Sequence, residues 1–139
     1  MTTNRNFLIL LCLSFTISSC SDNFESKVYG SANKIVFEIL SSNYVKVGGF
    51  AVYTKLTDKS GLVQKLWEIK FPSNLNWNKN KDLKIIHYGI TPKGFLQTVE
   101  PVLLQESTIY TYSIEAGKYE SSGCFYIKNN QVIQDNIHC

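Results

Sequence analysis

The segment CFYIKNNQVIQ, residues 124–134, holds two short β-patterns that flank the pair Asn129-Asn130. Asparagine tolerates the positive φ angles that both central residues of a type I′ turn require. Two asparagines between β-patterns therefore predict a hairpin with a two-residue primed turn. Such a turn sets the register, so Lys128 is expected to face Gln131 across the hairpin.

A similar alternation of apolar and polar residues recurs through the chain before this hairpin. Turn-forming residues separate the patterns, and no amphipathic helix is indicated. We expect an all-β fold, a single small antiparallel β-sandwich of about seven or eight strands, with a transthyretin-like sandwich or a small β-barrel as alternatives. The expected strands cover residues 34–40, 44–56 (with a bulge, bend or break at Gly48-Gly49), 62–71, 83–90, 95–99, 109–116, 124–128 and 131–134, and the expected loops include 72–82 and 117–123.

Composition places the chain among ordinary globular proteins of one domain. It has 139 residues, 44% of them hydrophobic and 18% charged, a balance that excludes a disordered chain. The net charge of +3 is too small to indicate a nucleic-acid partner. Fourteen Lys and Arg include a single arginine, Arg5, so thirteen lysines and no arginine follow residue 20. Bidentate recognition of carboxylate or phosphate uses arginine, which argues against an anion-reading site.

The N-terminus carries an export signal. Residues 7–15 are apolar, but the run is shorter than the ~20 residues that a membrane-spanning helix needs. Its length and flanks are typical of a secretory signal peptide. The following Ile17-Ser18-Ser19-Cys20 resembles the lipobox of bacterial lipoproteins.

The lipobox resemblance implies cleavage before Cys20 and acylation of its sulfur and its new amine. The alternative is an ordinary signal peptide with a coincidental cysteine. We therefore expect a signal peptide at 1–19, a lipidated cysteine and tether at 20–33, and a β-sandwich domain at 34–139. Two or three acyl chains make an effectively permanent membrane anchor.

The residue after the lipidated cysteine indicates whether the lipoprotein is sorted to the inner or to the outer membrane. By resemblance to enterobacterial sorting, aspartate at that position retains a lipoprotein in the inner membrane. Here Ser21 takes that position and Asp22 follows it. We expect the inner leaflet of the outer membrane, facing the periplasm, with the inner membrane as the alternative.

Two cysteines remain in the mature chain, Cys124 and Cys139. The exported compartment is oxidising, so they are expected to form a disulfide. In the hairpin register Cys124 faces Asp135, and a straight strand would carry Cys139 roughly 13 Å further along. A disulfide tolerates only about 4.4–6.8 Å between Cα atoms. The bridge therefore predicts that the last strand stops before Ile137 and that the chain folds back.

Residues 104–114, LQESTIYTYSI, resemble the tyrosine corner of fibronectin type III and immunoglobulin-like sandwiches, with Leu104 six residues before Tyr110. The proline that the fibronectin pattern places two residues after the leucine is absent. The resemblance implies that the Tyr110 hydroxyl bonds to upstream backbone and that Trp67 is the core tryptophan.

Residues suited to catalysis or metal binding are sparse. His87 and His138 lack metal-ligand spacing, and Glu100, Glu106, Glu115 and Glu120 are not paired by the sequence. We expect no enzyme activity, no cofactor and no metal site.

One loop stands out as a candidate contact site. Trp77 lies between Asn76 and Asn78, and an aromatic ring beside amides is suited to stacking on a sugar or anchoring a protein interface. The alternative is that Trp77 folds inward and covers one end of the domain.

These features predict a non-catalytic, lipid-anchored binding or accessory module in the cell envelope. One alternative is a periplasmic inhibitor or immunity protein that acts on an exported hydrolase or toxin. Another is a lipoprotein of a secretion apparatus. The expected partners are the membrane, through the anchor, and an envelope protein or exported enzyme.

Overall fold

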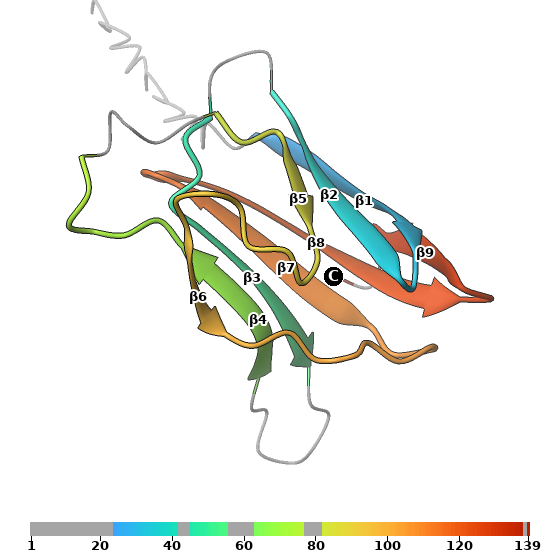
Figure 1. Cartoon of the computed structure of the whole chain (residues 1–139). Helices are drawn as coiled ribbons and strands as arrows, with labels where there is room; N and C mark the ends of the chain where they lie inside the picture. The colour runs from blue at the N-terminus through green and yellow to red at the C-terminus, as the bar shows by residue number, and fades with distance from the viewer. Residues whose placement is uncertain (1–23, 42–44, 56–62, 77–81, 138) are drawn as a thin grey trace, which may run out of the picture.

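Nine β-strands form within the residues that the computed structural model describes, 24–41, 45–55, 63–76, 82–137 and 139 (Figure 1). They are β1 Glu25–Ser31, β2 Lys34–Leu40, β3 Gly49–Lys55, β4 Val63–Lys70, β5 Ile85–His87, β6 Leu96–Val99, β7 Tyr110–Ala116, β8 Tyr119–Lys128 and β9 Gln131–Asp135.

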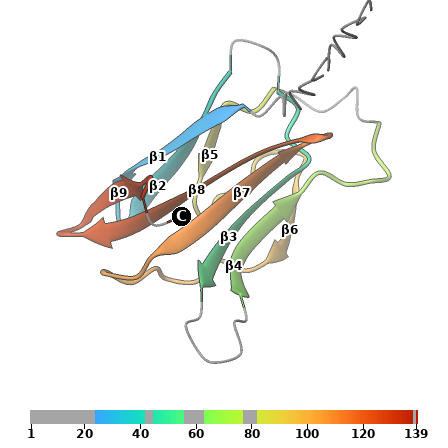
Figure 2. The same ribbon diagram turned by 180° about the vertical axis from the view of Figure 1, so that it is seen from behind.

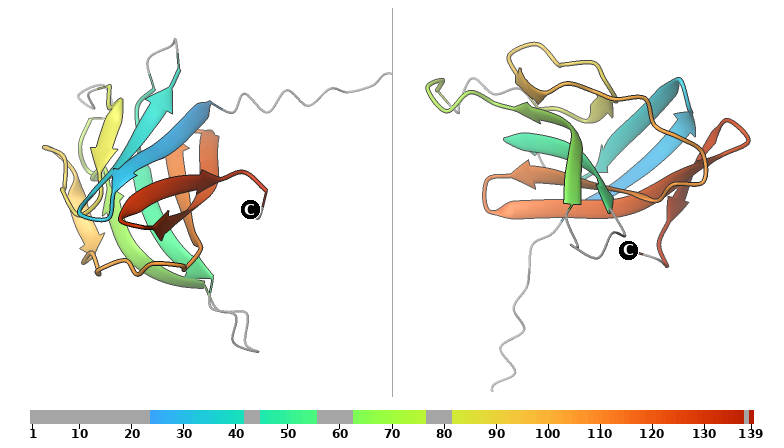
Figure 3. Two further views of the ribbon diagram at one scale, coloured as in Figure 1. Left: turned by 90° about the vertical axis from the view of Figure 1, so that its right-hand side faces the viewer. Right: turned by 90° about the horizontal axis from the view of Figure 1, so that it is seen from below.

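The strands form one antiparallel sheet in the order β5-β2-β1-β9-β8-β7-β3-β4-β6. The sheet curls so that β5, β2 and β1 lie opposite β7, β3 and β4 (Figure 3). The junction between β1 and β9 is short, the pair Ser31↔Gln131. The prediction of a small all-β domain is confirmed, and the curled sheet lies between the sandwich and the barrel that the sequence left as alternatives.

The core fills the concave side of the sheet. Phe37 of β2 contacts Phe50, Tyr112 and Phe125, whose ring centroids lie 4.7, 5.0 and 5.6 Å from its own. These tilted and edge-on contacts are the geometries that aromatic rings prefer. Trp67 is fully buried, as the comparison with immunoglobulin-like sandwiches implied. Aromatic contacts thus join the two halves of the sheet across its interior.

The hairpin predicted at the C-terminus is present. Asn129 and Asn130 have φ angles of 51° and 62°, as a type I′ turn requires. Lys128 pairs with Gln131 and Cys124 pairs with Asp135. The predicted register is therefore confirmed.

The expected tether is too long. Residues 25–31, which were expected within it, form β1 and pair with β2 through the whole of its length. The local pattern is weak because Val28 is the buried residue of this strand, but β2 offers a complete row of backbone partners. Gly30 has a φ of 115°, and a Cβ there would lie 2.1 Å from the Lys34 carbonyl oxygen, so the turn between the two strands requires glycine.

The loop expected at 117–123 is also wrong. A tight turn at Gly117, with a φ of 64°, leads directly into β8 at Tyr119. The serines and glycine of this segment suggest a loop, but its backbone pairs with β7 in an unbroken register. A Cβ at Gly123 would lie within 2.8 Å of the Tyr112 ring, so the missing side chain lets the tyrosine pack against the strand.

Candidate functional site

An open groove of about 670 Å³ lies beside the β8–β9 hairpin. Phe125 and Ile127 of β8 face the core, so the alternating Tyr126 and Lys128 face outward. The residues that line the groove are Ser107, Ile109, Tyr126, Lys128, Gln134, Asp135, Asn136 and Ile137. The groove is therefore on the convex face, between the segment before β7 and the end of β9, and its volume is within the ~300–1,000 Å³ common for ligand pockets.

The C-terminal tail forms one wall of this groove. Cys139 is bonded to Cys124, with 5.5 Å between the two Cα atoms. The tail turns back because the Ile137 amide donates to Asp135 Oδ1 at 2.9 Å. The predicted disulfide is confirmed, together with the prediction that the last strand stops before Ile137.

Tyr110 holds the opposite wall. Its hydroxyl accepts a hydrogen bond from the Gln105 amide at 2.7 Å and donates to the Gln105 carbonyl at 3.2 Å. The Ser107 amide donates to the Ile127 carbonyl at 3.0 Å, which fixes the segment beside β8. The hydroxyl-to-backbone bonds implied by the tyrosine corner are thus present.

Two polar groups in the groove have no partner within the described part of the chain: the Tyr126 hydroxyl and the Lys128 ammonium. The side chains of Ile109 and Ile137 flank them and are 42% and 87% exposed. The groove thus combines exposed apolar surface with hydrogen-bonding groups, which suits non-covalent binding.

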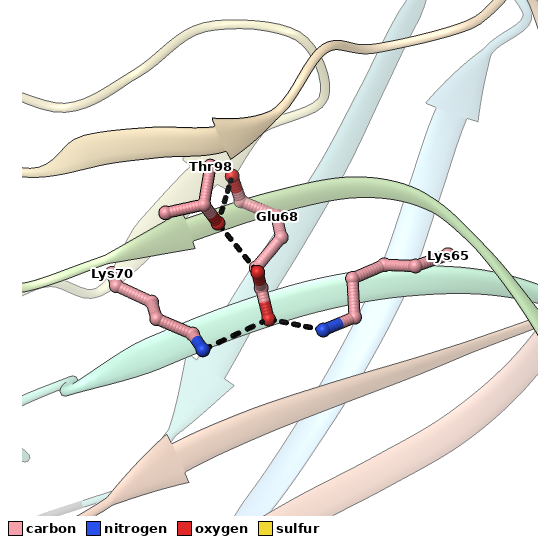
Figure 4. Close-up of polar contacts among 4 residues, drawn as sticks. All are labelled: Lys65, Glu68, Lys70 and Thr98. Atoms are coloured by element: carbon pink, nitrogen blue, oxygen red, sulfur yellow. Dashed lines mark hydrogen bonds and ion pairs between the residues drawn. The ribbon is translucent and has the colours of Figure 1, made fainter.

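A second polar cluster lies on the convex face of β4, around Glu68 (Figure 4). Glu68 accepts bonds from Lys65, from Thr98 of β6 and from Lys70, the last at 3.3 Å. Its neighbours Trp67 and Ile69 face the core, so alternation predicts a solvated carboxylate, yet Glu68 is only 8% exposed. Opposite charges two and three residues away are the signal that sequence reasoning missed.

The cluster holds Glu68 ionised. Burial opposes ionisation of its carboxyl group, but hydrogen bonds from Lys65 and Thr98 outweigh burial and lower its pKa. The bond to Glu68 in turn raises the pKa of Lys65. The two lysines and Thr98 all bond to the Glu68 carboxylate, so each polar group has a partner within the cluster. This arrangement is typical of a structural ion-pair network.

The other residues that could carry chemistry are dispersed. Glu106 accepts a hydrogen bond from the Asn130 amide, and Cys124 is bridged rather than free. His87 lies on β5, half-buried, and His138 lies outside the described residues. Among the residues that the structure describes, no group of three His, Cys, Asp or Glu side chains is placed to hold a metal ion.

Most of the remaining sequence candidates fall outside the described part of the chain. Trp77, Asn78 and the lipidation residue Cys20 are among them. Asn76 is described and exposed, just after a turn closed by the Leu75 amide on the Pro72 carbonyl. The Trp77 contact site therefore stays a prediction.

Comparisons with known proteins add no family. No protein-family model, no curated protein and no solved structure matches this chain. Within the described ranges, no helix has the length and apolar character needed to span a bilayer.

Proposed function

We propose that this chain is a lipid-anchored protein of the bacterial cell envelope that binds a partner without catalysing a reaction. Cys20 carries the lipid in this proposal, and the outer membrane, facing the periplasm, is its site. The observation that carries the proposal is Ile17-Ser18-Ser19-Cys20 at the end of the apolar N-terminal run.

The disulfide supports an exported location. A Cys124–Cys139 bridge persists in an oxidising compartment and is rare in the cytosol. It closes a loop of the outer face and pulls the tail into the groove wall. A bridge in this place therefore agrees with export and shapes the surface that we assign to the partner.

The groove supports the binding part of this proposal. Tyr126 and Lys128 offer hydrogen-bonding groups, and Ile109 and Ile137 offer exposed apolar surface beside them. Asp135 also lines the groove, and its Oδ1 accepts the Ile137 amide and so holds the tail in the groove wall. Exposed apolar surface beside hydrogen-bonding groups is the combination typical of non-covalent binding sites.

The lipid anchor is tested by metabolic labelling with an alkyne fatty acid. Cys20→Ser should lose the label and accumulate as precursor or soluble protein. Cys12→Ser, which removes a cysteine from the signal peptide itself, is the matched control and should keep the label. A Cys20→Ser protein that stays labelled and resists carbonate extraction would refute the lipoprotein assignment.

The groove is tested with a photo-crosslinking amino acid placed at Ile109 in living cells. Val63 of β4 is the control position because it is apolar and comparably exposed, at 59% against 42%. A discrete adduct from Ile109 alone supports the groove as the partner surface. Equal adducts from both positions would reject it.

A further inference from the structure

The domain has two opposite ends along the direction of strands β1 and β8, and side-chain contacts and strand pairing identify them. Ser26 Oγ lies 2.6 Å from Ser121 Oγ, so β1 begins beside the start of β8. At the other end of both strands, Ser31 pairs with Gln131 next to the β8–β9 hairpin. Figures 1 and 2 show the start of β1 and the β7–β8 turn on one side, and the hairpin on the other. We call these the anchor end and the hairpin end.

The chain between the proposed lipid and the fold is short. Five residue steps separate Cys20 from Glu25, and they reach at most about 18 Å when fully extended. Residues 121–128 of β8 alone span roughly 23 Å. With the hairpin on the bilayer and β8 upright, Glu25 would thus lie beyond the reach of its own anchor.

The tether could become longer only if the first residues of β1 separated from the sheet, and the contacts of β1 make that separation unfavourable in free energy. The strand pairs with β2 from Glu25 to Ser31. Ser26 Oγ also bonds to Tyr112 Oη at 3.0 Å, and the Val28 amide donates to Gln134 Oε1 at 3.1 Å. Releasing β1 would break both the ladder and these side-chain bonds, so the first residues of the strand remain part of the domain.

Charge does not select the end that meets the lipid. Described lysines and acidic residues are interspersed at the anchor end, so no strong attraction to anionic lipid is expected. The charged side chains in question are Lys46, Lys84, Lys118, Glu25, Asp82, Glu115 and Glu120.

We infer that the domain stands on the bilayer through its anchor end, with the β7–β8 turn at the lipid surface and the groove at the hairpin end facing away. This inference rests on the proposed lipidation of Cys20. The partner of the anchor end is the lipid surface, and the tether length sets the orientation. A partner in the groove would thus meet the protein above the membrane rather than within the headgroups.

Fluorescence quenching measures this orientation. A small fluorescent amino acid replaces Lys118, in the β7–β8 turn, or Lys34, at the hairpin end; both side chains are exposed. The lipidated proteins are reconstituted in phosphatidylethanolamine vesicles containing nitroxide-headgroup lipid, with or without phosphatidylglycerol. Intact mass confirms the lipid on Cys20 before each measurement.

Quenching is expected at position 118 and absent at position 34, with no change when phosphatidylglycerol or salt is added. Inserting twenty Gly/Ser residues after Ser21 extends the tether by an average of about 25 Å and should abolish the difference. Equal quenching at both positions in the lipidated protein, or none at 118, overturns the orientation. Absence of lipid by mass overturns the proposed function instead, so the two failures are distinguishable.

Discussion

Glu68 and Asp135 are both carboxylates on the convex face, and they are 8% and 9% exposed. Glu68 is surrounded by side chains, two lysines and Thr98, which satisfy it within the network. Asp135 instead accepts the Ile137 amide and so turns the tail back beside a groove. Equal burial thus accompanies an ion-pair network in one place and the wall of a groove in the other. A buried carboxylate alone does not identify a binding surface.

The largest effect on stability is expected from removing the disulfide that holds the tail beside Asp135. Replacing both Cys124 and Cys139 by serine opens a loop of 15 residues and should lower the free energy of unfolding by about 3 kcal/mol. Urea unfolding measures the loss, and the mass of the oxidised wild type should fall two hydrogens below that of the reduced protein. An unchanged midpoint would show that the bridge does not stabilise this end of the fold.

Tyr110→Phe removes the hydrogen bonds that hold the opposite wall of the groove, the segment before β7. It removes the hydroxyl that bonds both the amide and the carbonyl of Gln105, so we expect a loss of about 1–3 kcal/mol. Tyr126→Phe is the matched control, because no described residue bonds the Tyr126 hydroxyl. If the two variants unfold at the same denaturant concentration, the hydroxyl of Tyr110 does not hold the wall.

Glu68→Gln tests the other side of the comparison. The carboxylate loses its charge while Lys65 and Lys70 remain partly exposed and can be hydrated, so a loss of about 1 kcal/mol at pH 7 is expected. Glu38→Gln, in the more exposed Lys27–Glu38 pair, should change stability by less than about 0.5 kcal/mol. Equal losses from the two variants would remove the distinction between the cluster and a surface pair.

Acid should erase the effect of Glu68→Gln. Because the pKa of Glu68 is lowered in the folded state, its stabilisation is full above the unfolded pKa of about 4.3 and is lost as pH falls through the folded value. Urea midpoints of wild type and Glu68→Gln, measured from pH 7 downward, should therefore converge as the pH falls from the unfolded pKa through the lower folded pKa of Glu68. A constant gap in acid would assign the loss to packing rather than to charge.

The smallest effect is expected from Asp135→Asn. An amide oxygen can still accept the Ile137 amide, so the free energy of unfolding should change by less than about 0.5 kcal/mol. Chemical denaturation beside Glu68→Gln measures the contrast. A loss as large as that of Glu68→Gln would mean that the charge of Asp135, and not its geometry, holds the tail.

Local and covalent constraints made part of the fold and of the groove predictable. A two-residue turn at Asn129-Asn130 sets a register by counting, and the register with the limit on disulfide length forces the tail to fold back. The hydroxyl-to-backbone bonds of Tyr110 were implied by the resemblance of residues 104–114 to a tyrosine corner, a local motif. The sequence therefore predicted the fold-back of the tail by counting and the Tyr110 bonds by resemblance. It did not predict that the two segments line one groove.

Amino-acid sequence by itself determined the all-β class, the final hairpin, its register and the disulfide. Tertiary structure alone decided that residues 25–31 and 119–123 form strands, that Glu68 is buried and that a groove lies beside Tyr126. Polar segments of this kind carry a weak period-two pattern, and each is held as a strand by its hairpin neighbour, residues 25–31 by β2 and residues 119–123 by β7, whose backbone groups they satisfy. Burial of Glu68, in contrast, depends on Thr98, thirty residues away on β6. Contacts over such separations depend on the curvature and pairing of the whole sheet, which no local pattern encodes.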